Sequence, residues 1–295
     1  MRTNAPNPSP VYRIAGLSVL VVLLWGVTAW LRMLAADVPP LELTGIALIG
    51  AAVSSRMLPG TRGALTFALR EHPWYAWLAV IVGPIASAAF YFAALAYAPA
   101  AQVVVITYSW PLLFAITSDV YIRRRPMPLT FFSLCLGLAG VAVMQDWATA
   151  PSFDAWLGYA GALLAGLSWV GYSLFLQVYS RAIAPAYPAF FAAGAILALT
   201  LQAGFGGLVW PGSLSSWAAG VALGIGPYGL GFVAWGYVVR HGNPRIVPVV
   251  PYAVPAVAAI TLVLAGRTQP TLPLLAGCML VLLACAASAC VRAPR

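Results

Sequence analysis

The stretch TYSWPLLFAIT at residues 107–117 is repeated later in the chain as PYAVPAVAAIT at residues 251–261. Trp25 recurs as Trp169 at the same offset, so the second half of the chain repeats the first. If each half crosses a bilayer an odd number of times, the two copies must point in opposite directions. Such inverted repeats are typical of transporters that work by alternating access. The repeat therefore predicts that the chain moves a solute.

The composition requires a lipid environment. Of the 295 residues, 62% are hydrophobic and only 7% are charged, which is too few to cover a water-soluble surface. Polar residues separate ten apolar runs, most of which are long enough to cross a hydrocarbon core of about 30 Å. The runs are Ile14–Leu31, Leu41–Ser54, Trp74–Tyr97, Gln102–Tyr121, Leu129–Gln145, Trp156–Tyr179, Tyr187–Trp210, Trp217–Val238, Ile246–Ala265 and Leu272–Val291. We predict an all-α integral membrane protein with ten transmembrane helices, built as two inverted five-helix repeats.

All fifteen basic residues are arginines, and their positions test this count of helices, because cytoplasmic loops retain positive charge. With the N-terminus inside, only Arg32 and Arg267 fall on the outer side. The net charge of +9 is therefore a signal of topology. A nucleic-acid surface would instead need basic residues clustered on a soluble face. We expect both termini in the cytoplasm.

The repeat also sets the expected domain boundaries. Residues 1–12 are rich in Pro, Asn and Ser and are expected to form a flexible cytoplasmic tail. The two five-helix repeats are expected over residues 13–146 and 156–291. The first apolar run resembles a secretory signal, but Trp25 within it is echoed in the second half. We therefore interpret this run as a retained helix.

Charged side chains are absent from the middle of every predicted span. Glu42 and Asp119 come closest, each toward one end of its helix. A proton-coupled pump normally needs a titratable group near the membrane midplane, and a carrier for highly charged substrates usually needs a buried counter-charge. The sequence therefore predicts transport without proton coupling.

Catalytic, metal and cofactor chemistry has little support in the sequence. His72 and His241 lie at arginine-rich borders, without the nucleophile, base or ligand cluster that an enzyme site needs. The four cysteines lack CxxC spacing. The GIGPYG run at residues 224–229 matches a dinucleotide motif, but it lies within an apolar helix and not after a strand. We expect no enzyme activity, no metal and no cofactor.

Prolines occupy matching places in the two halves and are expected to bend the spans, because each removes a backbone donor. In a bilayer such backbone is tolerated where it packs on protein or lines a cavity. Kinks that only serve packing are the alternative. The predicted hinge residues are Gly83, Pro84, Pro111, Gly226, Pro227 and Pro255.

Aromatic side chains lie at repeat-related, mid-membrane positions close to these kinks. Any one of them has packing as an equal explanation, but the set favours the lining of a shared cavity. The predicted substrate-binding residues are Trp25, Tyr91, Tyr108, Trp110, Trp169, Tyr172, Trp235 and Tyr252.

The Tyr-x-x-Pro stretches that begin at Tyr108 and Tyr252, together with the pair Trp25 and Trp169, resemble the drug/metabolite transporter superfamily. The resemblance is to its EamA-type members, which have ten helices in two five-helix repeats. Among these, the chain is most similar to bacterial inner-membrane exporters of aromatic amino acids. This resemblance implies a multi-pass protein of the inner membrane. It also implies a central cavity among the first, third, fourth, sixth, eighth and ninth helices.

The leading hypothesis is a monomeric secondary transporter that exports amino acids, aromatic and other neutral ones, from the cytoplasm by alternating access. Aromatic rings hold apolar side chains by stacking and dispersion, and they attract an ammonium group through cation–π interactions. Export of amphipathic drugs or lipids is an alternative, and a non-transporting membrane subunit is another. The expected partners are the small-molecule substrate and the lipid bilayer, with no nucleic acid.

Overall fold

The computed structural model describes residues 10–63, 65–124, 128–244 and 246–290. Within these ranges the chain contains helices and no strand, so the prediction of an all-α protein is confirmed. The α-helices are α1 (Pro10–Gly26), α2 (Thr28–Leu34), α3 (Pro40–Ser55), α4 (Leu65–Glu71), α5 (Trp74–Trp77), α6 (Gly83–Tyr97), α7 (Ala100–Thr107), α8 (Trp110–Thr117), α9 (Pro128–Val143), α10 (Ala155–Val178), α11 (Tyr187–Phe205), α12 (Leu214–Leu223), α13 (Gly231–His241), α14 (Ala253–Leu264) and α15 (Leu272–Cys290). Segments of π-helix are η1 (Leu78–Val82), η2 (Ser118–Arg123) and η4 (Gly224–Leu230), and segments of 3₁₀-helix are η3 (Ala184–Ala186) and η5 (Val250–Tyr252).

Six helical runs in the described residues are long and apolar enough to cross a membrane. They are Tyr12–Leu34, Trp74–Tyr97, Ala100–Ile122, Ala155–Val178, Ala184–Phe205 and Leu214–His241. Four shorter apolar helices lie where the sequence predicts the remaining spans: Pro40–Ser55, Pro128–Val143, Val250–Leu264 and Leu272–Ser288. The 16 residues of α3 extend about 24 Å, less than the hydrocarbon core of about 30 Å. The chain is a multi-pass membrane protein, and the crossing of the four shorter helices stays a prediction.

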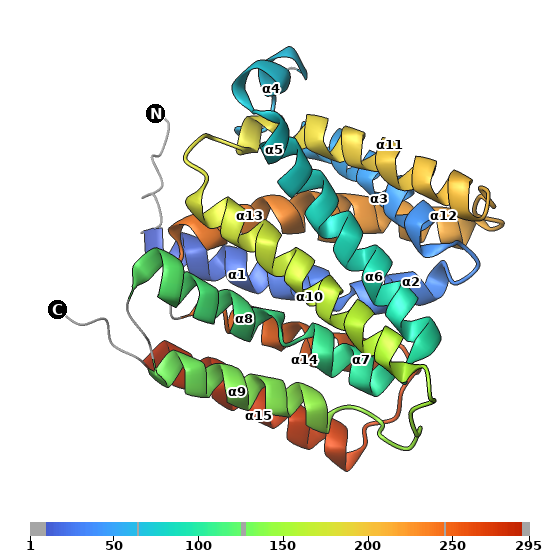
Figure 1. The fold of residues 1–295 in the computed structure, drawn as a ribbon, viewed down its shortest axis with the longest axis vertical. Coiled ribbons are helices and arrows are strands. Elements are labelled where there is room, and N and C mark those ends of the chain that lie inside the picture. Colours follow the sequence, from blue (N-terminus) through green and yellow to red (C-terminus); the bar gives the residue numbers. More distant parts are fainter. Residues whose placement is uncertain (1–9, 64, 125–127, 245, 291–295) are drawn as a thin grey trace, which may run out of the picture.

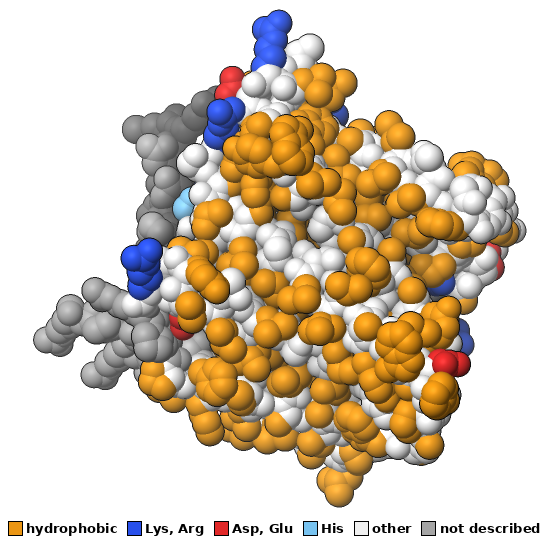
Figure 2. Space-filling model, viewed as in Figure 1, with side chains coloured by type: hydrophobic (Ala, Val, Ile, Leu, Met, Phe, Trp, Pro, Cys, Tyr) orange, Lys and Arg blue, Asp and Glu red, His pale blue; other side chains and the backbone are white. Residues whose placement is uncertain are grey.

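The surface is apolar across the middle of the molecule. Figure 2 shows hydrophobic side chains spread over the face in view, with Arg, Asp and Glu atoms near its edges. Large side chains such as Phe132, Ile196 and Leu282 are exposed. Lipid tails can cover these side chains in a bilayer, where charged groups remain at the two polar borders.

Two long spans change from α to π geometry beside a Gly-Pro pair. In one span η1 ends directly before Gly83 and Pro84, and in the other η4 contains Gly226 and Pro227. Proline lacks the N–H that the helix needs, and its ring crowds the carbonyl four residues earlier, so the local turn widens. The predicted weak points therefore coincide with irregular helix, while their motion stays a prediction.

The other two predicted hinge residues lie at the start of a helix. α7 ends at Thr107, and α8 begins at Trp110 with Pro111 in its first turn. Pro255 similarly lies in the first turn of α14. The N–H groups of a first turn have no partner within the helix, so proline is tolerated there. These prolines therefore mark breaks between helix segments, where a bend within one continuous helix was expected.

The closest helix pairs join the two halves of the chain. α10 lies along α6, α11 along α3, and α15 along α9 (Figure 1). Glycines permit this close approach. A Cβ at Gly158 of α10 would lie 2.4 Å from the Ala98 Cβ, and a Cβ at Gly140 of α9 would lie 2.9 Å from the Gly277 carbonyl oxygen. The core of the protein is therefore the junction between its halves.

Two acidic side chains of the first half accept hydrogen bonds from the loop between α11 and α12 and from the first turn of α12. Glu42 is fully buried, and its carboxylate accepts hydrogen bonds from the backbone N–H groups of Val209 at 2.9 Å and Trp210 at 2.6 Å. Asp37 accepts from the Ser216 hydroxyl at 2.6 Å, and this bond lowers the pKa of Asp37 below its ordinary value. Because charge-assisted hydrogen bonds are stronger than neutral ones, the loop is held firmly against the first half.

Candidate functional site

Four indoles form a closed ring where the two halves meet. Trp25 of α1 lies 5.5 Å from both Trp169 of α10 and Trp235 of α13, measured between ring centroids. Trp110 of α8 closes the ring, at 6.0 Å from Trp169 and 5.9 Å from Trp235. We call these four residues the tryptophan ring. Trp25 and Trp169 are repeat-related, so equivalent residues of the two halves are in direct contact.

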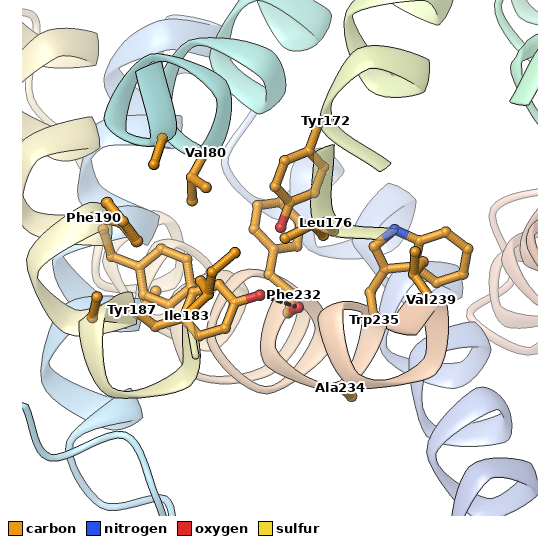
Figure 3. Close-up of a cluster of buried hydrophobic side chains, with 14 of the residues drawn as sticks. Val80, Tyr172, Leu176, Ile183, Tyr187, Phe190, Phe232, Ala234, Trp235 and Val239 are labelled. Atoms are coloured by element: carbon orange, nitrogen blue, oxygen red, sulfur yellow. Dashed lines mark hydrogen bonds between the residues drawn. The ribbon is translucent and has the colours of Figure 1, made fainter. Parts of the chain in front are cut away.

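Two further aromatic residues extend the tryptophan ring on one side. Phe232 of α13 lies 5.6 Å from Trp169 and 6.1 Å from Trp25. Tyr172 lies 5.3 Å from Trp169 and 6.3 Å from Phe232. Edge-to-face and tilted contacts at these distances are favourable for aromatic pairs. Figure 3 shows Tyr172, Phe232 and Trp235 together with the residues around them. The sequence analysis missed Phe232, although its place one helical turn before Trp235 puts it on the same face.

Two of the four indole N–H groups of the tryptophan ring donate hydrogen bonds within the protein. Trp25 Nε1 donates to the Pro227 carbonyl at 3.1 Å, which ties α1 to the irregular segment η4. Trp235 Nε1 donates to the Ser173 hydroxyl at 3.3 Å, within a fully buried setting. Within the described part of the chain, the N–H groups of Trp110 and Trp169 have no acceptor. Two donors are therefore free to meet a ligand.

The irregular segments lie against this cluster. A Cβ at Gly83 would lie 2.9 Å from the Tyr172 Cβ, and a Cβ at Gly231, directly after η4, would lie 2.8 Å from Trp25 Nε1. Only glycine fits at such distances without a shift of the neighbour. The backbone of each π-helical span therefore touches an aromatic residue of the opposite half.

Three of the predicted site residues pack elsewhere. Tyr91 packs in a cluster with Tyr159 between α6 and α10. Tyr108 and Tyr252 belong to a cluster formed by α7, α8, α9, η5, α14 and α15. Tyr252 is fully buried there, so closely packed that a Cβ at Gly137 of α9 would lie 2.6 Å from its ring. The structure thus brings together Trp25, Trp110, Trp169, Tyr172 and Trp235 of the eight predicted residues.

A cavity adjoins the tryptophan ring on the side of Tyr172 and Phe232. Its empty space is about 340 Å³, but it is so narrow that it holds only about one water molecule. We call it the side pocket. Its lining residues come from α3, η1, α6, α10, α11, η4 and α13: Thr44, Leu48, Val80, Ile81, Pro84, Ile85, Tyr172, Phe190, Phe191, Gly194, Tyr228 and Phe232.

Neither region provides metal or acid–base chemistry. The side pocket is lined by apolar and hydroxyl side chains, without Asp, Glu, His, Lys or Arg. Among the described residues, no group of three or more His, Cys, Asp or Glu could hold a metal ion. The arrangement can hold an apolar ring and attract a cation through π faces, and it supplies a few neutral hydrogen-bonding groups.

His72, one of the two border histidines, is buried away from the tryptophan ring. Its Nδ1 lies 2.9 Å from the Tyr179 hydroxyl, and Arg240 donates to the Tyr179 carbonyl. Burial lowers the pKa of His72 below 6.5, and the nearby Arg181 lowers it further. His72 therefore favours its neutral form and packs α4 and α5 against the loop after α10.

The chain matches the profile described as the EamA-like transporter family over residues 13–145 and again over residues 156–289. It is 32% identical over 266 residues to a protein of Ancylobacter novellus described as "Aromatic amino acid exporter YddG", which covers 88% of this chain and 91% of that relative. A solved crystal structure matches with a TM-score of 0.84 at 29% identity, over 93% of this chain and 96% of that chain. The resemblance predicted from the Tyr-x-x-Pro stretches and from Trp25 and Trp169 is confirmed.

Proposed function

Because the chain belongs to the EamA-like transporter family, we propose that it exports amino acids, aromatic and other neutral ones, from the cytoplasm across a bacterial inner membrane. The observation that carries this proposal is the tryptophan ring, in which side chains of both halves meet at the core of the protein. The name of the Ancylobacter relative, an aromatic amino acid exporter, supports the same class of substrate.

The chemistry of the tryptophan ring suits a zwitterion with an apolar side chain. The indole faces attract the α-ammonium group by cation–π interaction and hold apolar atoms by dispersion. The unused N–H groups of Trp110 and Trp169 are available to the α-carboxylate, because indole nitrogen is a donor only. No buried counter-charge is required for a substrate whose net charge is zero.

The proposed topology is ten crossings in two inverted five-helix repeats, over residues 13–146 and 156–291, with residues 1–12 as a cytoplasmic tail. The arginine distribution supports cytoplasmic termini, and the helix pairs that join the halves support a repeat. The four shorter helices would cross by local thinning of the bilayer or by snorkelling of their flanking residues. Because the substrate site lies within one chain, we propose a monomer.

Alternating access would use the irregular segments as hinges. η1 with Gly83 and Pro84, and η4 with Gly226 and Pro227, occupy related places in the two halves. Each touches an aromatic residue of the opposite half, so bending there would move the tryptophan ring and the backbone together. The breaks before Pro111 and Pro255 supply a second pair of flexible points.

We further propose that transport follows the substrate gradient without proton coupling. The side pocket lacks an acid or a histidine, and a proton-coupled carrier normally needs such a group near its substrate. Efflux from proteoliposomes should therefore proceed at the same rate with and without an imposed pH gradient. Flux that occurs only when the pH gradient is present would contradict this mechanism.

Trp169→Ala tests the proposed site. Proteoliposomes containing the wild-type protein should exchange labelled L-phenylalanine, and the variant should lose severalfold to about tenfold in flux, since an aromatic contact contributes about 0.5–1.5 kcal/mol and about 1.4 kcal/mol corresponds to a factor of ten. The matched control is Trp156→Ala, because Trp156 lies on the same helix but is 61% exposed. Equal flux in both variants would remove the tryptophan ring from the substrate site.

The apolar, uncharged lining of the side pocket also favours a second candidate, export of amphipathic drugs or lipids. Counterflow separates the two. If unlabelled amino acids loaded inside the proteoliposomes drive the uptake of labelled phenylalanine from outside and loaded cationic dyes do not, amino-acid transport is supported. The reverse result would favour the drug or lipid exporter.

A further inference from the structure

Two residues lie between the side pocket and the tryptophan ring. Tyr172 and Phe232 line the pocket, and both contact Trp169 of the ring. A ligand whose charged end lies on the tryptophan ring could therefore place its side chain against these two residues, in the side pocket. The rest of the pocket is formed by η1, α6 and η4, and by α3 and α11, from which no substrate contact was expected.

One polar atom in the pocket wall lacks a partner. The Tyr172 side chain is 1% exposed, and its hydroxyl makes no hydrogen bond among the described residues. The neighbouring Tyr187 hydroxyl lies close enough to interact with the Tyr172 hydroxyl, but the two do not form a hydrogen bond, and Tyr187 donates to the Phe232 carbonyl at 3.4 Å. Figure 3 shows the Tyr172 side chain directed toward Phe232. Because a buried hydroxyl without a hydrogen-bond partner is unfavourable, we infer that a bound ligand supplies the partner of the Tyr172 hydroxyl.

We propose that the side pocket receives the aromatic side chain of the exported amino acid, and that Tyr172 determines which ring is preferred. This inference rests on the amino-acid export proposed above. The indole N–H of tryptophan can donate to the Tyr172 oxygen, and the phenol of tyrosine can donate or accept. Phenylalanine leaves the hydroxyl unpaired, so it should bind more weakly than tryptophan or tyrosine.

The pocket is too narrow to hold a ring as it stands, and its walls explain how it would widen. Val80 and Ile81 belong to η1, Pro84 follows it, and Tyr228 belongs to η4. Both proposed hinges therefore form part of the wall. Bending at either segment changes the width of the pocket, so binding of the side chain and the change of access are coupled.

Tyr172→Phe tests the role of the hydroxyl with almost no change in shape. KM and maximal rate are measured in proteoliposomes for L-tryptophan, L-tyrosine and L-phenylalanine with wild type and variant. The KM for tryptophan and tyrosine should rise about tenfold, the usual effect of losing a buried hydrogen bond, while the KM for phenylalanine stays the same or falls. A uniform change for all three substrates, or no change, would overturn the role of Tyr172.

Gly194→Ala tests the pocket itself. A Cβ at Gly194 would lie 3.2 Å from Leu48 Cδ1 and 3.6 Å from Ile85 Cδ1, so the added methyl group fills the pocket without meeting backbone. The variant should weaken tryptophan transport most and the transport of small neutral amino acids least. The control is Gly204→Ala on the same helix, where nothing lies within 4 Å.

The outcomes separate this inference from the function on which it rests. If Gly194→Ala and Gly204→Ala transport all substrates like the wild type, the pocket does not hold the side chain, although amino-acid export stands. If the wild-type protein transports none of the three aromatic amino acids, the proposed function fails and the side pocket loses its substrate.

Discussion

In the first half of the chain the residues before Tyr108 form the regular helix α7, whereas in the second half the residues before Tyr252 form turns and the short η5. The two segments are repeat-related, and prolines account for the difference. Pro248 and Pro251 occupy the places of Val104 and Thr107. Proline cannot donate to a helix, so the same repeat yields a helix once and an irregular segment once.

The two segments also differ in how they are held. α7 and its continuation are fastened to α10 by side-chain hydrogen bonds, from Tyr159 to Gln102, from Thr107 to the Ala162 carbonyl at 3.3 Å, and from Ser118 to Gln177 at 3.0 Å. The equivalent contact of α14 with α1 lacks such bonds among the described residues and depends on close packing at Gly26.

This difference suggests which side of the protein moves. In the proposed alternating access one repeat moves against the other, so an asymmetry between the halves would distinguish one end state from the other. The α7–α8 side is held to α10 by hydrogen bonds along its length, while the α14 side packs on α1 through apolar contacts. We expect the α14 side to undergo the larger displacement when this state converts to the other.

The largest effect is expected from Gly26→Val. A Cβ at Gly26 would lie 2.3 Å from Val257 Cγ1 and 3.3 Å from the Ala258 nitrogen, so α14 must separate from α1. Overpacking of this kind destabilises by about 1–3 kcal/mol, and flux in proteoliposomes should fall by at least about tenfold. Gly16→Val, on the same helix with nothing within 4 Å, should be neutral. Normal flux in Gly26→Val would mean that close packing of α14 on α1 is not needed for transport.

A smaller effect is expected when the second half is given the residues of the first. Pro248→Val with Pro251→Thr should extend α14 toward its N-terminus, because each proline disfavours a helix interior by about 3 kcal/mol. We expect higher helicity by circular dichroism and a severalfold lower flux. Pro151→Thr, in an exposed loop, is the control. If helicity rises and flux is unchanged, the irregular segment is not needed for transport.

Much of this architecture can be predicted from the sequence, because lipid imposes a simple pattern. Apolar runs mark the spans, and prolines mark the places where they break. The sequence does not reveal that Gly83-Pro84 and Gly226-Pro227 adopt π geometry, since an apolar run looks the same with either hydrogen-bond register. Residues 246–249 were expected to be helical but form turns, because Pro248 and Pro251 act together.

The candidate site was predictable where repeat symmetry applied. Trp25 and Trp169 are related by the repeat and are in contact. Tyr108 and Tyr252 are also repeat-related, yet both pack away from the tryptophan ring, because the face of a helix that an aromatic residue occupies depends on the break before it. The only signal for Phe232 was its place one helical turn before Trp235, and the side pocket carried none, since apolar residues are abundant in every span.

Ser118→Ala and Gln177→Leu measure how strongly hydrogen bonding holds the α7–α8 side to α10. Their hydrogen bond joins η2 to α10, and interhelical hydrogen bonds in membrane proteins contribute about 0.6 kcal/mol on average. A double-mutant cycle on unfolding in mixed micelles should give a coupling energy of about that size. Additive effects of the two single changes would show that the α7–α8 side is not held by this bond.

The smallest effect concerns pH. Because burial lowers the pKa of His72 below its unfolded value of 6.5, the neutral form favours folding. This contribution is fully present above pH 6.5 and is lost as the pH falls through 6.5 toward the folded pKa. His72→Gln should therefore reduce the fall in Tm between pH 7.5 and about 5.5 by about 1–2 °C. An identical pH profile in wild type and variant would contradict the shift.

Isothermal titration calorimetry of L-phenylalanine binding to the purified protein asks whether the tryptophan ring is the substrate site. Binding can be measured without any change of access, so this result does not depend on the proposed hinges. If the tryptophan ring binds substrate, L-phenylalanine binds saturably to the wild-type protein and to Trp156→Ala. A folded Trp169→Ala variant should lose this binding. Binding of equal affinity to Trp169→Ala would contradict it, because the tryptophan ring would then be packing alone.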